Sequence, residues 1–146
     1  FGFIFQDGQL LPELTAKENV ALPQIMRGES RSKAHAEATD MLTRLGLGNF
    51  VNRFPGQLSG GQSQRVAIAR ALAGPPSVVF ADEPTAALDQ ATGHEVMQQI
   101  TAVAQKFGVT LVLVTHDPKI AQWCDRRIEI RDGLIHSEGA AKAVQA

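Results

Sequence analysis

The sequence predicts an α/β domain with a parallel sheet, and three observations support this class. Residues 10–73 have mainly helical patterns. Two short apolar runs, residues 77–81 and 110–114, have the β-branched composition of strands. Between these runs, apolar side chains recur at helical spacing from Val96 to Phe107. A strand, a helix and a second strand in this order form a βαβ unit with parallel strands, which we expect to be buried on both faces.

Length, composition and charge limit the classes of protein that fit. The chain has 146 residues, enough for one domain with a core, and its 44% hydrophobic and 20% charged residues are typical of globular proteins. The formal net charge is −1, without the basic excess that recruits nucleic acid, so we expect no nucleic-acid partner. Cys124 is the only cysteine, which excludes an internal disulfide. No apolar run approaches the ~20 residues of a membrane span.

The N-terminal part predicts a strand followed by helices. Residues 1–5, FGFIF, are an apolar run of strand type without an initiator methionine, and we expect the sequence to begin inside a domain. After a polar break, the TAKE stretch at 15–18 has capping-box spacing and starts a short helix. Apolar residues recur at helical spacing from Ala34 to Leu45, and Gly46 is suited to end that helix.

A helix that begins with glycines follows. The stretch LSGGQSQRVAIARAL, residues 58–72, has two glycines directly before strong helix formers, and Ser59 can cap a helix from about 61 to 73. A helix N-terminus exposes unpaired N–H groups and a partial positive charge, and glycines let an anion approach the backbone. The stretch therefore indicates a phosphate-binding helix end. A glycine-rich cap that binds no ligand is the alternative.

Polar and acidic side chains follow both strands of the βαβ unit. Asp82 and Glu83 come directly after the first strand, and Thr115 and His116 after the second. Ligands of parallel sheets bind beyond the carboxyl ends of the strands, so these side chains are expected to share one edge, where they can bind a divalent metal and activate water. Neighbouring residues of an extended chain point to opposite sides, so one acid is expected on the metal side and the other on the water side. The alternative is two solvated acids that cap the next helix and a histidine in a loop.

The last segments complete the second half of the domain. A helix is predicted from Pro118 to Cys124, and residues 126–138 predict a hairpin around Asp132 and Gly133. The other histidines have no metal-site spacing and are expected at ordinary surface or helix positions: His35, His94 and His136.

Three stretches, in this order, resemble the ATPase domain of ABC transporters: LSGGQSQRVAIARAL, VVFADEPTAALD and LVTHD. The segment FIFQDGQLLPELTAKENVALP before them is also similar to that family, so the resemblance runs from Phe1 to about Gly139. Residues 58–62 match the five-residue ABC signature in full, and this pentapeptide followed by an acidic strand end is highly specific. The first segment and residues 126–132 are most similar to the subfamily of lipoprotein-release and macrolide-efflux systems.

The resemblance implies a P-loop NTPase-like parallel sheet core with an inserted α-helical subdomain. The helical signature subdomain would span about 10–73, and the C-terminal part of the α/β core about 77–138. The implied cofactors are ATP and Mg²⁺.

The resemblance also implies a role for each motif residue in ATP hydrolysis. Gln6 matches the glutamine that senses the metal and the attacking water and links them to the membrane subunit. Asp82 matches the Walker B aspartate that binds Mg²⁺, Glu83 the general base that polarises water, and His116 the switch histidine that steadies the γ-phosphate. Phosphoryl transfer needs positioning and charge stabilisation more than covalent chemistry, which agrees with these roles.

Other residues match the parts of the family that act across a dimer. The signature contacts the γ-phosphate held by the opposite subunit, and its matched residues are Ser59, Gly60, Gly61 and Gln62. Asp89, in the AALD stretch, matches the loop that crosses the dimer interface. The implied partners are a second ATPase domain and integral membrane permease subunits, with the chain peripheral at the cytoplasmic face of the inner membrane.

The chain departs from the family pattern in three places. Ala86 stands where glycine is frequent, and Ser63 replaces a frequent Gln or Glu. No G-x-x-x-x-G-K-[ST] motif occurs in the sequence. We expect the phosphate-cradling lysine and the aromatic residue that stacks on adenine to precede Phe1, and we expect the chain alone to be inactive.

The leading functional interpretation is the ATP-hydrolysing subunit of an ABC exporter that moves a lipoprotein, peptide or drug-like substrate. An importer ATPase is the nearest alternative, because the motifs do not separate import from export. A DNA-repair or chromosome-maintenance ATPase carries long insertions between the glutamine and the signature, whereas one compact helical region fills the interval between Gln6 and Ser59 here. A non-hydrolysing relative is disfavoured because Glu83 and His116 are both present.

Overall fold

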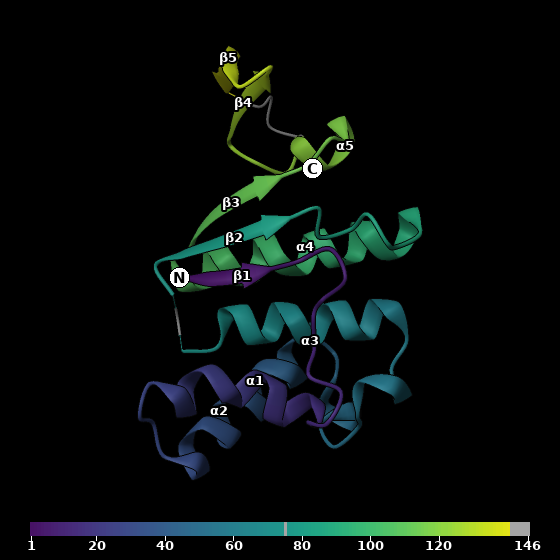
Figure 1. Cartoon of the computed structure of the whole chain (residues 1–146), viewed down its shortest axis with the longest axis vertical. Coiled ribbons are helices and arrows are strands. Elements are labelled where there is room, and N and C mark those ends of the chain that lie inside the picture. The colour runs from purple at the N-terminus through teal and green to yellow at the C-terminus, as the bar shows by residue number, and fades with distance from the viewer. Residues whose placement is uncertain (75, 141–146) are drawn as a thin grey trace.

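A three-stranded parallel sheet forms the centre of the chain (Figure 1). The computed structural model describes residues 1–74 and 76–140. The strands are β1 (Gly2–Ile4), β2 (Val78–Asp82) and β3 (Thr110–Val114), and they lie side by side in this order. Both pairs, β1 with β2 and β2 with β3, are parallel, as the βαβ pattern predicts for the second pair. The carboxyl ends of all three strands therefore meet at one edge.

The first half of the chain is helical, as predicted. It contains α1 (Ala16–Met26), α2 (Arg31–Arg44) and α3 (Gly60–Leu72), with short 3₁₀ turns at Gly48–Phe50 and Pro55–Gln57. Helix α1 begins at the predicted capping box, in which the Thr15 hydroxyl accepts from the N–H of Glu18 and the Glu18 carboxylate accepts from the N–H of Thr15 at 2.8 Å. The hydroxyl of Thr15 also donates to that carboxylate, which holds the pKa of Glu18 below its ordinary value.

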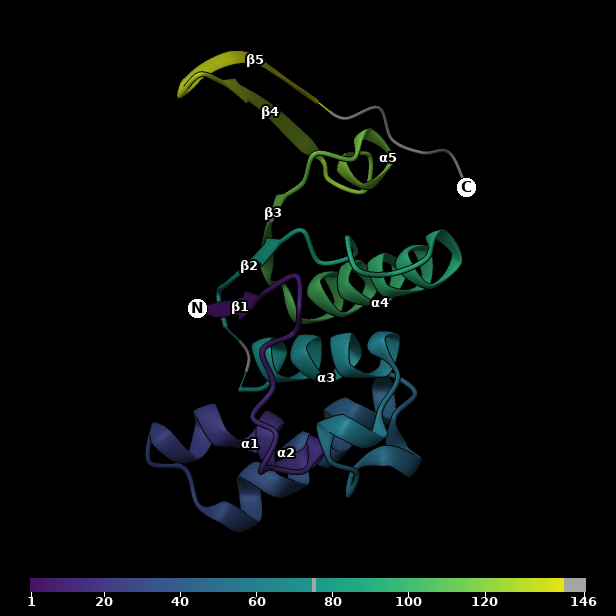
Figure 2. The same cartoon turned by 45° about the vertical axis from the view of Figure 1, so that its right-hand side comes forward.

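Helix α3 is the centre of the packing. The sheet and α4 (Gln90–Phe107) lie on one side of α3, and the α1–α2 pair lies on its other side (Figures 1 and 2). Its side chains from Val66 to Ala69 are fully buried. Strand β1 approaches it so closely that a Cβ at Gly2 would overlap the carbonyl oxygen of Ala71. Only glycine permits this approach, so β1 is seated directly on the C-terminal turns of α3.

Helix α4 forms the crossover between β2 and β3. Its buried stripe includes Val96, Met97 and Ile100, the helical spacing seen in the sequence. The helix ends at Gly108, whose φ of 62° is left-handed, a conformation that glycine adopts without strain.

The C-terminal segments follow the predicted order with one difference in length. Helix α5 (Pro118–Ala121) stops three residues short of the predicted end at Cys124, because the chain already turns at residues 122–125 to enter the hairpin. Strands β4 (Arg126–Arg131) and β5 (Leu134–Ala140) pair antiparallel. The turn residues Asp132 and Gly133 have φ values of 51° and 76°, which suits a two-residue hairpin turn.

One prediction about the sheet is wrong: its strands are not buried on both faces. Helices α3 and α4 cover one face, whereas Phe80 of β2 is 38% exposed and Val114 of β3 is 57% exposed. The aromatic rings of Phe3 and Phe80 stack on this open face with centroids 5.4 Å apart. No helix among the described residues covers that face, and its apolar side chains contact mainly one another.

Candidate active site at the edge of the sheet

The residues predicted to share one edge of the sheet lie there. Asp82 is the last residue of β2 and is paired with Val114, the last residue of β3. Glu83 and His116 follow these two strands, and Gln6 follows β1 by two residues. Three segments distant in sequence are thus brought together because their strands are parallel and adjacent.

Glu83 is the most strongly anchored of these side chains. Its carboxylate accepts hydrogen bonds from the N–H of His116 at 2.7 Å and from the hydroxyl of Thr115 at 3.1 Å. The backbone N–H of His116 binds Oε1 of Glu83, and Nδ1 of the His116 ring lies 2.5 Å from the same oxygen. The Glu83 side chain is 19% exposed and that of His116 is 86% exposed. The carboxylate is therefore held at the sheet edge, while most of the imidazole surface faces solvent.

The backbone at Glu83 separates it from Asp82. Glu83 has a φ of 45°, an uncommon left-handed value for a residue with a side chain. Its N–H donates to the carbonyl of Val114 at 2.9 Å, so the main chain stays bound to β3 while the strand geometry ends. Glu83 lines the hollow beside the sheet edge and Asp82 does not. The two acids therefore occupy different environments, as predicted, but the left-handed turn at Glu83 separates them and not the alternation of an extended chain.

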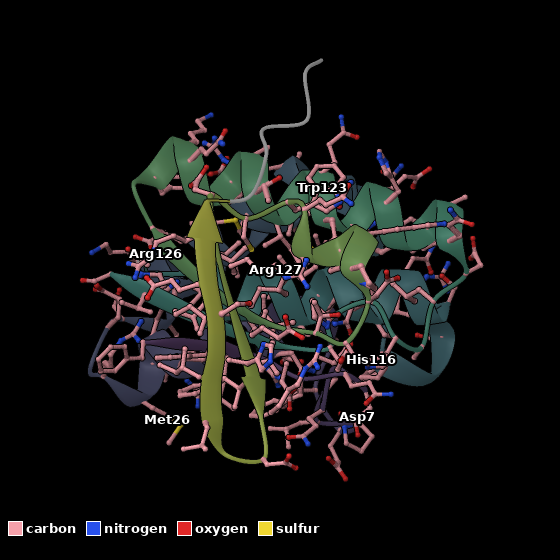
Figure 3. All side chains as sticks on the ribbon, turned by 90° about the horizontal axis from the view of Figure 1, so that it is seen from above. Asp7, Met26, His116, Trp123, Arg126 and Arg127 are labelled. Carbon is pink, nitrogen blue, oxygen red and sulfur yellow. The ribbon has the colours of Figure 1, made fainter. Side chains whose placement is uncertain are left out.

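A large open hollow lies at this edge, with a volume of about 1320 Å³. Side chains from α4 and α5 line part of it. Four of the predicted site residues also line it: Gln6, Glu83, Asp89 and His116. Figure 3 looks onto this region from above and shows His116 and Trp123 on either side of the short helix α5. Gln6 and Glu83 therefore line the same hollow.

His94 has a contact that the sequence did not predict. Its ring packs edge-on against Trp123 with centroids 4.9 Å apart, and both residues line the hollow. His94 lies at an exposed helix position, as predicted, but its contact with Trp123 could not be read from the sequence, because α4 and α5 are brought together only by the fold. Thr115 was likewise noted only as a strand-end residue, although its hydroxyl holds Glu83.

The signature residues form a capped helix start. The hydroxyl of Ser59 accepts from the N–H of Gln62 at 3.2 Å, and the side-chain oxygen of Gln62 accepts from the N–H of Ser59 at 2.9 Å. Ser59 and Gly60 are exposed. A Cβ at Gly61 would lie 2.8 Å from a methyl carbon of Thr92, so this glycine also allows α3 to approach α4. None of these four signature residues lines the hollow of its own chain.

Asp89 lines the hollow and, through Thr92, lies next to the signature residues. It caps α4, where its carboxylate accepts from the Thr92 hydroxyl at 2.6 Å and from the Thr92 N–H at 3.1 Å. The hydroxyl bond, with the backbone bond second, lowers the pKa of Asp89 below its ordinary value. Because Thr92 also faces Gly61, the start of α4 contacts both groups of predicted site residues. The site residues thus form two groups, one at the sheet edge and one at the signature. The start of α4, with Asp89 and Thr92, connects the two groups.

Comparisons with known proteins agree with this arrangement. The ABC transporter family pattern matches residues 1–86. The chain is 48% identical over 134 residues to the lipoprotein-releasing system ATP-binding protein LolD of Shewanella frigidimarina, covering 92% of this chain and 56% of that protein. It is 49% identical over 142 residues to the macrolide export ATP-binding/permease protein MacB of Syntrophobacter fumaroxidans, covering 96% of this chain and 20% of that protein.

Solved structures give the same result for the fold. A dimeric structure of the ATP-binding cassette MJ0796, in a post-hydrolysis state bound to ADP and Pi, superposes with a TM-score of 0.83 at 43% identity. The match covers 97% of this chain and 62% of that one, so the chain spans little more than half of a cassette. This similarity confirms the predicted P-loop NTPase-like α/β class. The chain belongs to the ABC transporter family.

Proposed function

We propose that this chain supplies the catalytic carboxylate, the switch histidine and the signature of an ATPase that powers an ABC exporter. The observation that carries the proposal is the anchored Glu83 carboxylate, bound by Thr115 and His116 at a sheet edge that also carries Asp82. Acting as general base, this carboxylate takes a proton from the water that attacks the γ-phosphate. In this proposal His116, which is largely exposed beside Glu83, donates to a phosphate oxygen.

The donor set at the edge fits Mg²⁺. Asp82 and Gln6 offer oxygen atoms, the ligands that a hard cation prefers. Among the described residues, no three His, Cys, Asp or Glu side chains are arranged to hold a metal ion by themselves. Mg²⁺ is commonly bound through one or two carboxylates and completed by substrate phosphates and water, so Asp82 and Gln6 would supply part of its ligands. Bound there, the ion would neutralise charge on the phosphates.

Replacing Asp82 with asparagine tests this assignment. In the whole protein that contains this chain, Asp82→Asn should weaken Mg²⁺-dependent ATP binding by about tenfold or more, because a neutral amide is a poorer ligand than a carboxylate. Equilibrium binding of a fluorescent ATP analogue across a Mg²⁺ titration measures the effect. Asp40→Asn, at an exposed position of α2, is the control and should titrate like the wild type. An unchanged Mg²⁺ dependence in Asp82→Asn would rule out the metal role.

A complete site needs a second copy. Ser59, Gly60, Gly61 and Gln62 do not line the hollow that holds Glu83, which supports their action on the nucleotide of an opposite subunit. We propose a head-to-tail dimer in which Asp89 lies at the interface, supported by the dimeric cassette structure. Within the chain, 10–73 would be the helical signature subdomain and 77–138 the C-terminal part of the α/β core.

The relatives suggest the transport step. Their names describe lipoprotein release and macrolide export, so we propose that the assembled protein exports or extracts a lipoprotein, peptide or drug-like substrate. Integral membrane permease subunits would be its partners, with the chain at the cytoplasmic face of the inner membrane. None of the described helices has the length and apolar character needed to cross a bilayer.

A further inference from the structure

The segment that carries Gln6 is bound along the signature helix. Gln64, 3% exposed in the second turn of α3, donates from its amide to the carbonyl of Phe5 at 3.2 Å. Arg70, nearer the end of the same helix, donates to the carbonyl of Gly8 at 2.7 Å and to that of Gln9 at 2.8 Å. The residues on both sides of Gln6 are therefore fixed to α3, although they precede it by about 60 positions in the sequence.

The backbone of this turn is one that persists only when contacts hold it. Gly8 and Gln9 are both left-handed, with φ values of 70° and 42°. A left-handed glutamine is uncommon and indicates a conformation imposed by its surroundings. A Cβ at Gly8 would contact Gln64 and Ala67 at 3.5 and 3.6 Å, so the turn lies directly on the surface of α3.

We propose that Arg70, assisted by Gln64, is a positioning residue that holds Gln6 in register with the signature helix. This inference rests on the proposed function, in which Gln6 acts on the metal and water of its own subunit. Helix α3 is capped at its start by Ser59, which in the proposed function acts on the nucleotide of the opposite subunit. The clamp of Gln64 and Arg70 therefore makes the Gln6 turn and the signature helix parts of one unit.

The chemistry of the contact favours arginine. A guanidinium presents donors in a planar fork and reaches two carbonyl oxygens at once, whereas a lysine ammonium is a point charge on a flexible stem. Burial lowers the pKa of Arg70, because its guanidinium is partly taken out of water. Arg70→Lys should therefore keep only part of the clamp.

The test measures steady-state ATP hydrolysis by the whole protein with Arg70→Met. We expect kcat to fall by about 10–100-fold, the effect of a small misplacement of a group that acts on the water, with KM for ATP within about twofold of the wild type. Arg70→Lys should recover part of kcat. Arg65→Met is the matched control: it removes the same charge from the same helix, but Arg65 binds Glu95 of α4 at 2.7 Å and not the Gln6 turn. A kcat for Arg70→Met equal to that of Arg65→Met would overturn the proposal.

A double-mutant cycle with Gln6→Ala separates positioning from loss of structure. If Arg70 acts through Gln6, Arg70→Met should lower kcat no further in the Gln6→Ala background. Independent, multiplicative losses would overturn the proposal. If Arg70→Met does not fold, Arg70→Lys and Gln64→Leu replace it in the double-mutant cycle with Gln6→Ala. No further loss of kcat in the Gln6→Ala background supports the proposal, and an independent loss overturns it. Wild type and Glu83→Gln are measured in parallel: a wild type without ATPase activity refutes the proposed function, whereas an active wild type with independent losses refutes the clamp alone.

Discussion

Replacing Glu83 with glutamine in the whole protein is expected to preserve ATP binding and to lower kcat for hydrolysis by about 10²–10⁴-fold. An amide of the same size can still accept from the N–H of His116 and meet the hydroxyl of Thr115, so the sheet edge keeps its geometry. It cannot take a proton from water at neutral pH. Steady-state phosphate release, with ATP binding measured separately, gives the two quantities.

A surface glutamate provides the control for this substitution. Glu29→Gln removes a carboxylate that pairs with Lys33 at an exposed position, and exposed ion pairs contribute little to stability. Its kcat should match that of the wild type. Wild-type turnover by Glu83→Gln would show that the base lies elsewhere.

The largest effect on stability is expected from Asn19→Ala. Asn19 is fully buried at the start of α1. Its Oδ1 accepts from the N–H of Leu11 at 2.8 Å, and its amide donates to the carbonyls of Leu11 and Leu14, both at 3.0 Å, and of Thr15 at 3.1 Å. Alanine removes the side-chain partner of the Leu11 N–H and the Leu14 carbonyl inside the protein, whereas the carbonyls of Leu11 and Thr15 keep backbone bonds from Leu14 and residue 19. The free energy of unfolding should therefore fall by about 2–4 kcal/mol in urea denaturation.

Asn52 is a suitable control for Asn19. Its side chain is exposed and accepts one long bond, 3.4 Å from Nζ of Lys17. Asn52→Ala should change the free energy of unfolding by less than about 0.5 kcal/mol. If Asn19→Ala were as mild as Asn52→Ala, the buried network would contribute nothing to the fold.

Features set by local chemistry could be predicted from the sequence. The capping box at Thr15, the helix cap at Ser59 and the hairpin turn at Asp132 depend on residues within a few positions, and all three are present. The meeting of Glu83 and His116 was also predictable, because a βαβ unit places the ends of its strands at one edge.

Features that depend on tertiary contacts could not be predicted in the same way. Arg70 reaches Gly8 across 62 positions, and no periodicity in the sequence relates the two. The pairing of His94 with Trp123 likewise requires α4 and α5 to be placed first. The prediction that the strands are buried on both faces is wrong for the same reason. The apolar residues of β3 show that its faces can pack against other apolar groups, but they do not show which face a helix covers.

The central claim, that each ATP site combines Glu83 of one subunit with the signature of another, is tested most directly by mixing two inactive variants. Glu83→Gln and Ser59→Arg are co-expressed in the whole protein with different tags, and the mixed dimers are assayed for ATP hydrolysis. In a mixed dimer one site contains both substitutions and the other contains neither. The isolated mixed dimers should therefore recover about half of wild-type activity, since each has one intact site of two. Activity no higher than that of the separate variants would contradict a site shared between subunits.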